Sequence, residues 1–266
     1  MHSGLALLMD VYRPERGNSC GVVYINGSGW HMPLAYDAAP LKETRLGMPY
    51  IEAMQGAGYT VFAINHRAAP RFRYPAALED AQRAVRFVRH HAERFGINSG
   101  RIGACGGSSG GHLVSLLGTL SGEGDADDPD PVNRESAAVQ CVVARAAPVD
   151  LSTTIQGAVA DFMGMLPRGE ASGAYALEHK TYREASPINH VSSRTPPFFL
   201  IHGEADTTVP YEQSLLMKAA LSKAGVPVEL LCIPGAGHGP DFPGANNPPD
   251  YLGALTRWFD KHLRGD

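Results

Sequence analysis

Residues 101–113 read Arg-Ile-Gly-Ala-Cys-Gly-Gly-Ser-Ser-Gly-Gly-His-Leu, and this stretch is the most informative about the fold of the 266-residue chain. A short apolar run at 102–105 enters a turn dense in glycine. Apolar side chains at helical spacing then follow, from Leu113 to Leu120. The pattern predicts a strand, a sharp turn and a helix, with a serine held away from the sheet in a strained backbone conformation.

Two serines compete for the tip of this turn. The residues two before and two after the tip must be nearly free of side chain so that strand and helix can pass each other. Gly106 and Gly110 meet this need around Ser108, and the next pair of glycines meets it around Ser109. Spacing alone leaves both registers open. In either one, the unpaired N–H groups of the first helical turn can stabilise a developing oxyanion.

Composition predicts one α/β domain over residues 1–266. Apolar residues make up 44% of the chain and charged residues 19%, and no linker-like stretch divides it. The net charge of −4, with no basic run, argues against nucleic acid or an anionic membrane as a partner. The cysteines lack metal-ligand spacing, so we expect buried thiols and no metal site. They are Cys20, Cys105, Cys141 and Cys232.

The beginning of the chain lacks the basic segment of a signal peptide, because the apolar run at 5–9 leads straight into Asp10. No stretch approaches the length of a membrane span. We therefore expect a cytoplasmic protein.

Apolar strand-like runs alternate with amphipathic helical patterns, which predicts a mainly parallel sheet covered by helices on both faces. The segment 151–196 is irregular, and we expect it to form a small cap-like insertion. Ligands should gather at the carboxyl ends of the strands. The predicted strands are 5–12, 21–26, 59–65, 102–105, 138–146, 198–202 and 228–233; the helices besides the one after the serine turn are 46–57, 78–95, 211–224 and one ending near 262.

Four polar or glycine-rich loops fall at such strand ends: 26–30, the serine turn, 203–206 and 235–239. A serine needs a neighbouring imidazole to take its proton, and that imidazole needs a carboxylate on its other nitrogen. The loops supply these groups in the order serine, acid, histidine, which is typical of α/β-hydrolases.

For the acid we prefer Asp206, which lies in a short polar turn just past a strand; Glu204 and Asp150 are the alternatives. As loop carboxylates, all three could simply make local hydrogen bonds.

For the base we prefer His238, because glycines flank it in the loop after the last strand. His202 lies inside an apolar strand and is expected to be a core residue. His112 lies one turn along the helix from Ser108, where it would line or buttress the site and point away from the serine tip.

Motifs over nearly the whole chain support a family resemblance. The chain resembles the α/β-hydrolase carboxylesterases of the group that includes BD-FAE-like feruloyl and acetyl esterases, near the hormone-sensitive-lipase type. The motifs are Asp-Val-Tyr-Arg-Pro at 10–14, Tyr-Ile-Asn-Gly-Ser-Gly-Trp at 24–30, Tyr-Pro-Ala-Ala-Leu-Glu-Asp at 74–80, the serine turn, Tyr-Arg-Glu-Ala-Ser-Pro at 182–187, His-Gly-Glu-Ala-Asp at 202–206, Val-Pro at 209–210 and Gly-His-Gly at 237–239.

The resemblance implies an assignment for each site residue. The family turn reads Gly-x-Ser-Ala-Gly-Gly-His-Leu, which implies Ser108 as the nucleophile and puts Ser109 at the alanine position. It further implies Asp206 as the acid, His238 as the base, and an oxyanion hole from the amides of Ser28, Gly29 and Ser109. The family usually has His-Gly-Gly-Gly-Trp at 26–30, so Asn26 replaces the histidine and Ser28 the second glycine.

From this resemblance we expect a serine esterase that hydrolyses small carboxylic esters without metal or organic cofactor. The expected partner is a small-molecule ester, and a homodimer is compatible with the sequence. The short segment 151–196 disfavours long-chain triglycerides. An apolar substrate slot is expected from Trp30, His112, Phe162 and Met163, with Phe242 as a further wall residue; packing in the core or cap is the alternative for the apolar ones.

Two other functions remain compatible with the sequence. An amide hydrolase, such as an arylformamidase or a prolyl-oligopeptidase-like peptidase, would use the same three residues. A non-catalytic binding protein of the same fold typically lacks one of them, whereas this chain retains all three.

Overall fold

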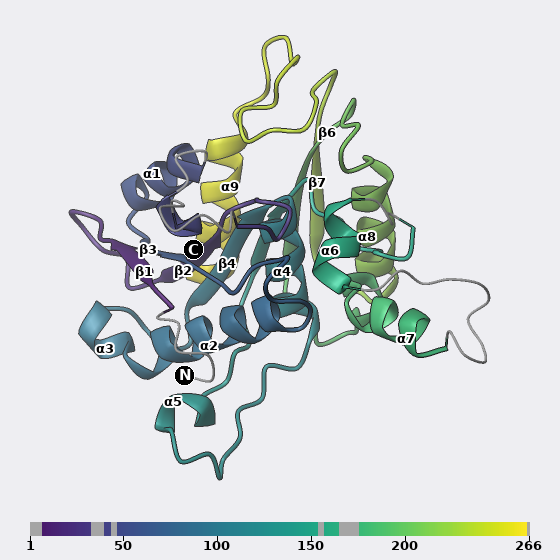
Figure 1. The fold of residues 1–266 in the computed structure, drawn as a ribbon. Coiled ribbons are helices and arrows are strands. Elements are labelled where there is room, and N and C mark those ends of the chain that lie inside the picture. Colours follow the sequence, from purple (N-terminus) through teal and green to yellow (C-terminus); the bar gives the residue numbers. More distant parts are fainter. Residues whose placement is uncertain (1–6, 33–39, 44–46, 154–156, 165–175, 265–266) are drawn as a thin grey trace.

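The computed structural model describes residues 7–32, 40–43, 47–153, 157–164 and 176–264. Its centre is a seven-stranded sheet in the order β1-β3-β2-β4-β5-β6-β7 (Figure 1). β1 is antiparallel to β3, and every other neighbouring pair is parallel. The strands are β1 Met9–Tyr12, β2 Gly21–Ile25, β3 Thr60–Ile64, β4 Ile102–Gly107, β5 Val142–Arg145, β6 Phe198–Gly203 and β7 Val228–Ile233.

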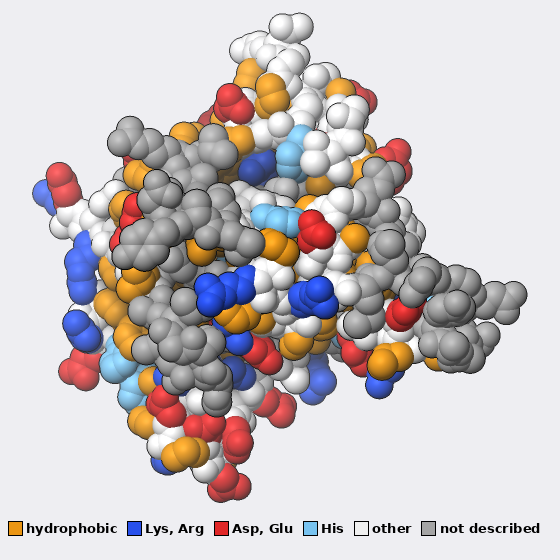
Figure 2. Space-filling model, in the orientation of Figure 1, with side chains coloured by type: hydrophobic (Ala, Val, Ile, Leu, Met, Phe, Trp, Pro, Cys, Tyr) orange, Lys and Arg blue, Asp and Glu red, His pale blue; other side chains and the backbone are white. Residues whose placement is uncertain are grey.

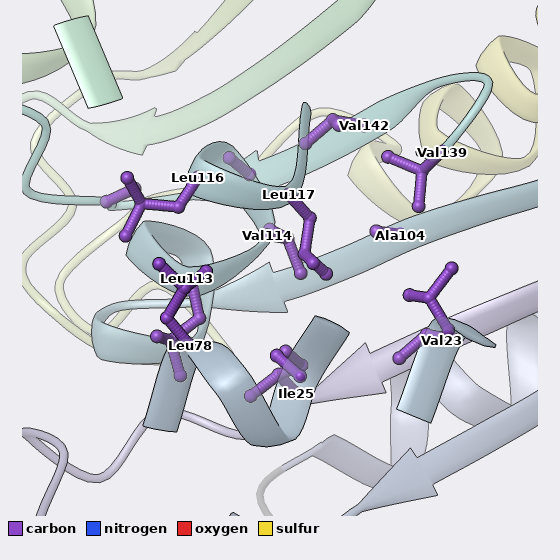
Figure 3. Packing of buried hydrophobic residues seen from close by; sticks show 14 of the residues in the cluster. Val23, Ile25, Leu78, Ala104, Leu113, Val114, Leu116, Leu117, Val139 and Val142 are labelled. Carbon is purple, nitrogen blue, oxygen red and sulfur yellow. The ribbon is translucent and has the colours of Figure 1, made fainter. Parts of the chain in front are cut away.

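Helices cover both faces of the sheet, because successive strand side chains point to opposite sides. In β2, Val23 and Ile25 pack into one apolar cluster with α2 (Ala76–His90) and α4 (Ser109–Thr119), part of which is shown in Figure 3. Val22 and Tyr24 pack into a second cluster with α1 (Met48–Gly56) and α9 (Tyr251–Phe259). The predicted arrangement, a mainly parallel sheet between two helical layers, is confirmed.

Of the remaining helices, α8 packs on β6 and β7 in the same apolar cluster as α2 and α4. The expected cap-like segment 151–196 contains α6, α7 and η4 in its described part, while 154–156 and 165–175 lie outside the described residues. The bounds are α3 Ala92–Phe95, α5 Pro131–Arg134, α6 Ala158–Met163, α7 Ala176–Glu184 and α8 Glu212–Lys223, with single turns η1 Leu41–Glu43, η4 Pro187–His190 and η5 Asp260–Arg264.

Three of the boundaries that differ from the sequence prediction have a visible physical reason. The helix expected over 78–95 is broken at His91, whose backbone (φ −103°, ψ 21°) leaves the helical region between α2 and α3. The strand expected over 138–146 is shorter, because the side-chain carbonyl of Gln140 accepts a bond from the Ile102 amide in place of regular pairing. β4 extends through Gly107, since β5 continues to pair beside it.

In the described part of the chain, no helix is both long enough and apolar enough to cross a bilayer. No cluster of three or more histidine, cysteine or carboxylate side chains suited to a metal ion is found among the same residues.

Candidate active site

Ser108 lies at the junction of β4 and α4 in a strained conformation. Its φ of 54° and ψ of −126° fall in a region that side-chain-bearing residues rarely adopt. Glycine on either side permits the turn: a Cβ at Gly106 would lie 2.6 Å from the Gly110 carbonyl oxygen, and one at Gly110 would collide with the Ile25 carbonyl. The close crossing of β4, α4 and β2 therefore presents Ser108 at the carboxyl edge of the sheet.

Ser109, the other candidate nucleophile, has different surroundings. It is the first residue of α4 and is only 1% exposed. Its Oγ accepts a hydrogen bond of 2.9 Å from the Ser28 amide. The structure therefore places Ser108, and not Ser109, next to an imidazole.

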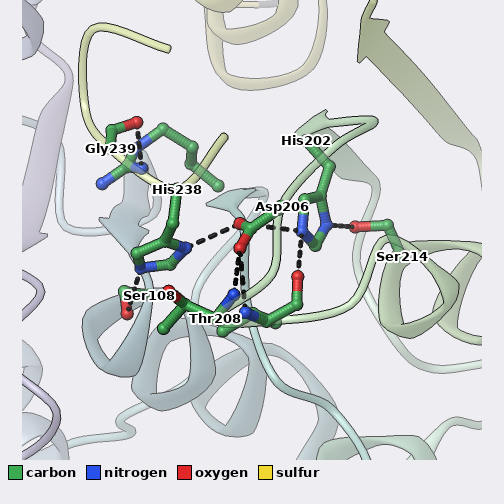
Figure 4. A network of polar contacts seen from close by, with 9 residues as sticks. Ser108, His202, Asp206, Thr208, Ser214, His238 and Gly239 are labelled. Carbon is green, nitrogen blue, oxygen red and sulfur yellow. Dashed lines mark hydrogen bonds and ion pairs between the residues drawn. The ribbon is translucent and has the colours of Figure 1, made fainter. Parts of the chain in front are cut away.

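The three predicted catalytic side chains meet at this edge (Figure 4). Ser108 Oγ lies 3.0 Å from His238 Nε2, and His238 Nδ1 lies 2.6 Å from Asp206 Oδ2. The serine follows β4, the acid follows β6 and the histidine follows β7. The parallel strands bring together a serine and a histidine that are 130 positions apart in the chain.

Asp206 is a buried carboxylate surrounded by donors. Its Oδ1 accepts hydrogen bonds of 2.9 Å from the amides of Thr208 and Val209. Burial alone would raise the pKa of Asp206, but hydrogen bonds with His202, His238 and the Val209 amide outweigh it and hold this pKa well below its usual range. The carboxylate therefore stays charged and fixes His238 with its proton on Nδ1.

His202 supports the acid from its far side. Fully buried, it lies with Nε2 at 3.3 Å from Asp206 Oδ2 and donates to the Val209 carbonyl at 2.9 Å. Its Nδ1 accepts a bond of 2.7 Å from Ser214 Oγ. His202 is a core residue, as the sequence predicts, and in addition it contacts the acid, which spacing within β6 could not reveal.

The alternative acids lie elsewhere. Glu204 is exposed, and the Asp150 carboxylate accepts local bonds from the Ser152 amide and hydroxyl.

The expected oxyanion hole is only partly free. Loop 26–30 lies close to the nucleophile, since a Cβ at Gly27 would lie 2.9 Å from Ser108 Cβ. The Ser28 amide already donates to Ser109 Oγ. Among the described residues, the amides of Gly29 and Ser109 have no acceptor. The acceptor of the Ser28 amide is the hydroxyl of Ser109. The resembled family has alanine at this position and therefore lacks this acceptor.

The side chains expected to bind substrate pack against one another in one apolar cluster. Trp30 stacks on Phe162 of α6, with ring centroids 4.6 Å apart, and donates from Nε1 to His112 Nδ1 at 3.1 Å. His112 donates from Nε2 to the Ala185 carbonyl at 2.7 Å. Met163 is also buried. None of these four residues lines the cavity beside Ser108, and their expected part in substrate binding stays a prediction. Phe242 is buried against Tyr251 of α9.

A cavity of about 420 Å³ opens beside Ser108, and a hollow with basic and histidine side chains at its floor is visible in Figure 2. Arg145 is a charged lining residue that the sequence analysis did not identify as part of the site. Its signal was a single charge at the carboxyl end of an otherwise apolar strand. The lining residues are Tyr24, Asn26, Gly27, Ser28, Gly29, Gly47, Ser108, Arg145, Thr208, His238, Gly239 and Pro240.

A larger hollow of about 560 Å³ lies along α2, away from these residues. Two of its basic side chains are paired with carboxylates, Arg67 with Asp80 and Arg83 with Asp130, and Arg86 donates to the backbone carbonyls of Glu123 and Glu135. It contains neither the serine nor the histidine, so the smaller cavity is the candidate active site.

The sheet order, the strained serine between strand and helix, and the contact of serine, histidine and acid define an α/β-hydrolase fold. Solved structures agree. The acetyl ester-xyloside bifunctional hydrolase from Caldicellulosiruptor lactoaceticus superimposes with a TM-score of 0.80 at 30% identity, over 98% of this chain and 89% of that one. Thermogutta terrifontis esterase 2 gives a TM-score of 0.73 at 25% identity, over 97% of this chain and 88% of that one.

The chain belongs to the BD-FAE family, whose model matches residues 9–221. Esterase LipC of Mycobacterium tuberculosis is 30% identical over 73% of this chain and 48% of its own length. Esterase LipQ of the same organism is 33% identical over 73% of this chain and 45% of its own length. The chain thus spans just under half the length of these two relatives. Ethyl acetate hydrolase of Pseudomonas putida is 25% identical over 88% of this chain and 71% of its own length.

Proposed function

We propose that this chain is a serine carboxylesterase that hydrolyses small carboxylic esters, with short-chain acyl or aryl groups, through an acyl-enzyme intermediate. The observation that carries the proposal is the hydrogen-bonded series from Ser108 Oγ through His238 to Asp206, with distances of 3.0 and 2.6 Å. The esterase names of several relatives support it.

In the first half of the reaction, Ser108 Oγ attacks the ester carbonyl carbon while His238 Nε2 takes the serine proton. The carbonyl oxygen becomes an oxyanion, for which the free amides of Gly29 and Ser109 are the available donors. The carbon–oxygen bond to the alcohol then breaks, and His238 gives its proton to the leaving oxygen. The acyl group remains on Ser108.

In the second half, His238 Nε2 takes a proton from water, and the hydroxide oxygen attacks the acyl carbon. The bond to Ser108 breaks, the serine oxygen regains the proton from His238, and the carboxylic acid leaves. Asp206 keeps its charge throughout and stabilises the imidazolium that forms in each half.

The cavity limits the size of the substrate. A volume of about 420 Å³ is at the small end of the range for ligand pockets. It fits an ester with a short acyl chain and a modest alcohol.

The first test replaces each candidate serine. Ser108→Ala should lower the kcat/KM for para-nitrophenyl acetate by at least about a thousandfold, because the nucleophile is lost. Ser109→Ala should lower it by about tenfold at most, because only one neutral hydrogen bond, that from the Ser28 amide, disappears. Initial rates from the release of para-nitrophenol measure both effects.

A covalent label provides the control. Paraoxon should add one diethylphosphoryl group to the wild-type protein and to Ser109→Ala, but none to Ser108→Ala, as measured by intact mass. The opposite pattern between the serines would contradict Ser108 as the nucleophile. Comparing the rates for para-nitrophenyl acetate with those for N-formylkynurenine and proline anilides separates ester hydrolysis from amide hydrolysis.

A further inference from the structure

Arg145 is an arginine at the edge of the candidate active site that the proposed reaction does not use. It is the last residue of β5, is only 7% exposed, and lines the same cavity as Ser108 and His238. In the sheet it lies opposite Gly107, the residue before the nucleophile. A Cβ at Gly107 would collide with the guanidinium group. The guanidinium therefore lies directly over the backbone that leads into Ser108.

The charge of Arg145 is only partly compensated. Nη1 donates to the Gly239 carbonyl at 2.8 Å, and Cζ lies 5.7 Å from the centre of the Tyr50 ring. No carboxylate of the described residues lies within ion-pair distance of it. Arg67, which is also largely buried, has both Asp80 and Glu79 as partners. Because a buried cation without an anion is costly, Arg145 is expected to meet its counter-charge in a bound molecule.

The rest of the cavity favours an anion as well. Among the described residues, its lining contains no aspartate or glutamate. Burial raises the pKa of the neighbouring Tyr24 and Tyr50 hydroxyls, so both stay neutral and leave the charge of Arg145 in place. One carbonyl and one ring face use only part of a guanidinium that carries five N–H donors.

We propose that Arg145 determines specificity by binding a carboxylate carried by the ester substrate. This inference rests on the proposed function and narrows its substrate class to esters with an anionic group close to the scissile bond. A planar guanidinium matches a carboxylate through two parallel hydrogen bonds, and a desolvated site strengthens both. The carboxylate belongs to the acyl part, as in a half-ester of a short dicarboxylic acid, or to the alcohol part, as in an acylated hydroxy acid.

Two substrate pairs test the proposal, each matching a carboxylate with its neutral carboxamide. Monomethyl glutarate and the corresponding carboxamide place the group on the acyl side. Para-acetoxybenzoate and para-acetoxybenzamide place it on the alcohol side. In one of the two pairs, we expect the wild-type kcat/KM for the ester that carries the carboxylate to exceed that for the ester that carries the carboxamide by about tenfold or more. The pair that shows the preference identifies the side of the ester that Arg145 binds.

Variants of Arg145 separate charge recognition from support of the loop. Arg145→Gln should lower the kcat/KM for the preferred carboxylate about tenfold more than for its amide, and Arg145→Lys should retain part of the preference. Arg83→Gln, which removes a guanidinium paired with Asp130 at the other hollow, is the matched control and should keep the wild-type ratio. If Arg145→Gln lowers carboxylate and amide equally, Arg145 only holds the Gly239 loop and the proposal is wrong.

A binding measurement distinguishes failure of this inference from failure of the proposed function. If neither the carboxylate-bearing nor the carboxamide-bearing esters are hydrolysed, the proposed function fails, and calorimetric titrations with monomethyl glutarate and with para-acetoxybenzoate then test Arg145 alone. Binding by the wild type that is lost in Arg145→Gln and kept in Arg83→Gln supports the carboxylate site. Absence of binding to the wild type, or equal binding by all three proteins, overturns it.

Discussion

His112 and Asp206 are buried ionisable residues. Their hydrogen-bond partners keep Asp206 charged and His112 neutral. Asp206 receives donors from two amides and two imidazoles, and it is charged. His112 receives the indole N–H of Trp30 at Nδ1, and an indole can only donate. The Nδ1 of His112 must therefore offer a lone pair, and its proton lies on Nε2, which faces the Ala185 carbonyl.

The buried state of His112 makes stability depend on pH. Burial lowers the pKa of His112 to about 4, although its bond to the Ala185 carbonyl acts in the other direction. Between about pH 4 and pH 6.5 the unfolded chain binds a proton at this site that the folded chain does not. The contribution of neutral His112 is therefore complete above about pH 6.5, and roughly 3 kcal/mol of it is lost as the pH falls to 4.

Urea unfolding of wild type and His112→Gln at pH 7 and pH 4 measures this effect. Glutamine keeps an acceptor and a donor but does not titrate. The stability advantage of the wild type over the variant should shrink by roughly 3 kcal/mol at the lower pH. An advantage that is the same at both pH values would show that His112 does not change its proton affinity on folding.

The close crossing of the elements β4 and α4 requires that residue 110 has no side chain. Gly110 is the third residue after β4, and its Cα faces the carbonyl groups of Ile25 and Asn26 at the end of β2. A methyl group there would separate the helix from the sheet. The same contact positions loop 26–30 against Ser108, so the packing of this helix and the formation of the site depend on one glycine.

We expect Gly110→Ala to cost about 1–3 kcal/mol of unfolding free energy, because backbone atoms that cannot rotate away must shift. Gly56→Ala is the matched control: its Cβ would meet nothing within 4 Å at the end of α1, and it should stabilise by up to about 1 kcal/mol. Denaturant midpoints of the two variants measure the contrast. Equal effects would mean that helix propensity, and not the crossing, decides the outcome.

In the whole molecule, the catalytic side chains come from the ends of strands, whereas α6 packs against the loops beside them. The stack of Phe162 on Trp30, together with the bond from the Tyr74 amide to the Phe162 carbonyl, holds α6 on the framework. Loop 26–30 therefore contacts the nucleophile through Gly27 and contacts α6 through Trp30. Packing of α6 helps to fix the loop that carries the Gly29 amide.

Phe162→Leu tests whether this ring binds substrate or only packs. We expect a loss of about 1–3 kcal/mol of stability, because a buried ring and its stacking contact are lost. The ratio of kcat/KM for para-nitrophenyl acetate to that for the butyrate ester should change by less than about twofold, since the ring lies outside the cavity. A severalfold change in this ratio would place Phe162 in contact with the acyl chain.

Much of the fold follows from residue types read locally. Apolar runs bounded by glycine predicted the strands, and the alternation with amphipathic helices predicted a parallel sheet between two layers. Boundaries were less predictable where a side chain replaces a backbone partner, as at Gln140, or where the backbone leaves the helix, as at His91. Such events depend on neighbours that lie far away in the sequence.

For the site, residue types and their positions along the chain are enough to predict the glycine-lined turn and the order of serine, acid and histidine. Three features are visible only in the folded molecule: Ser109 Oγ accepts the hydrogen bond from the Ser28 amide, Trp30 and Phe162 pack together, and Arg145 faces the cavity without a described carboxylate beside it. Each of these is a contact between residues distant in the chain. Local spacing carries no information about which distant groups meet.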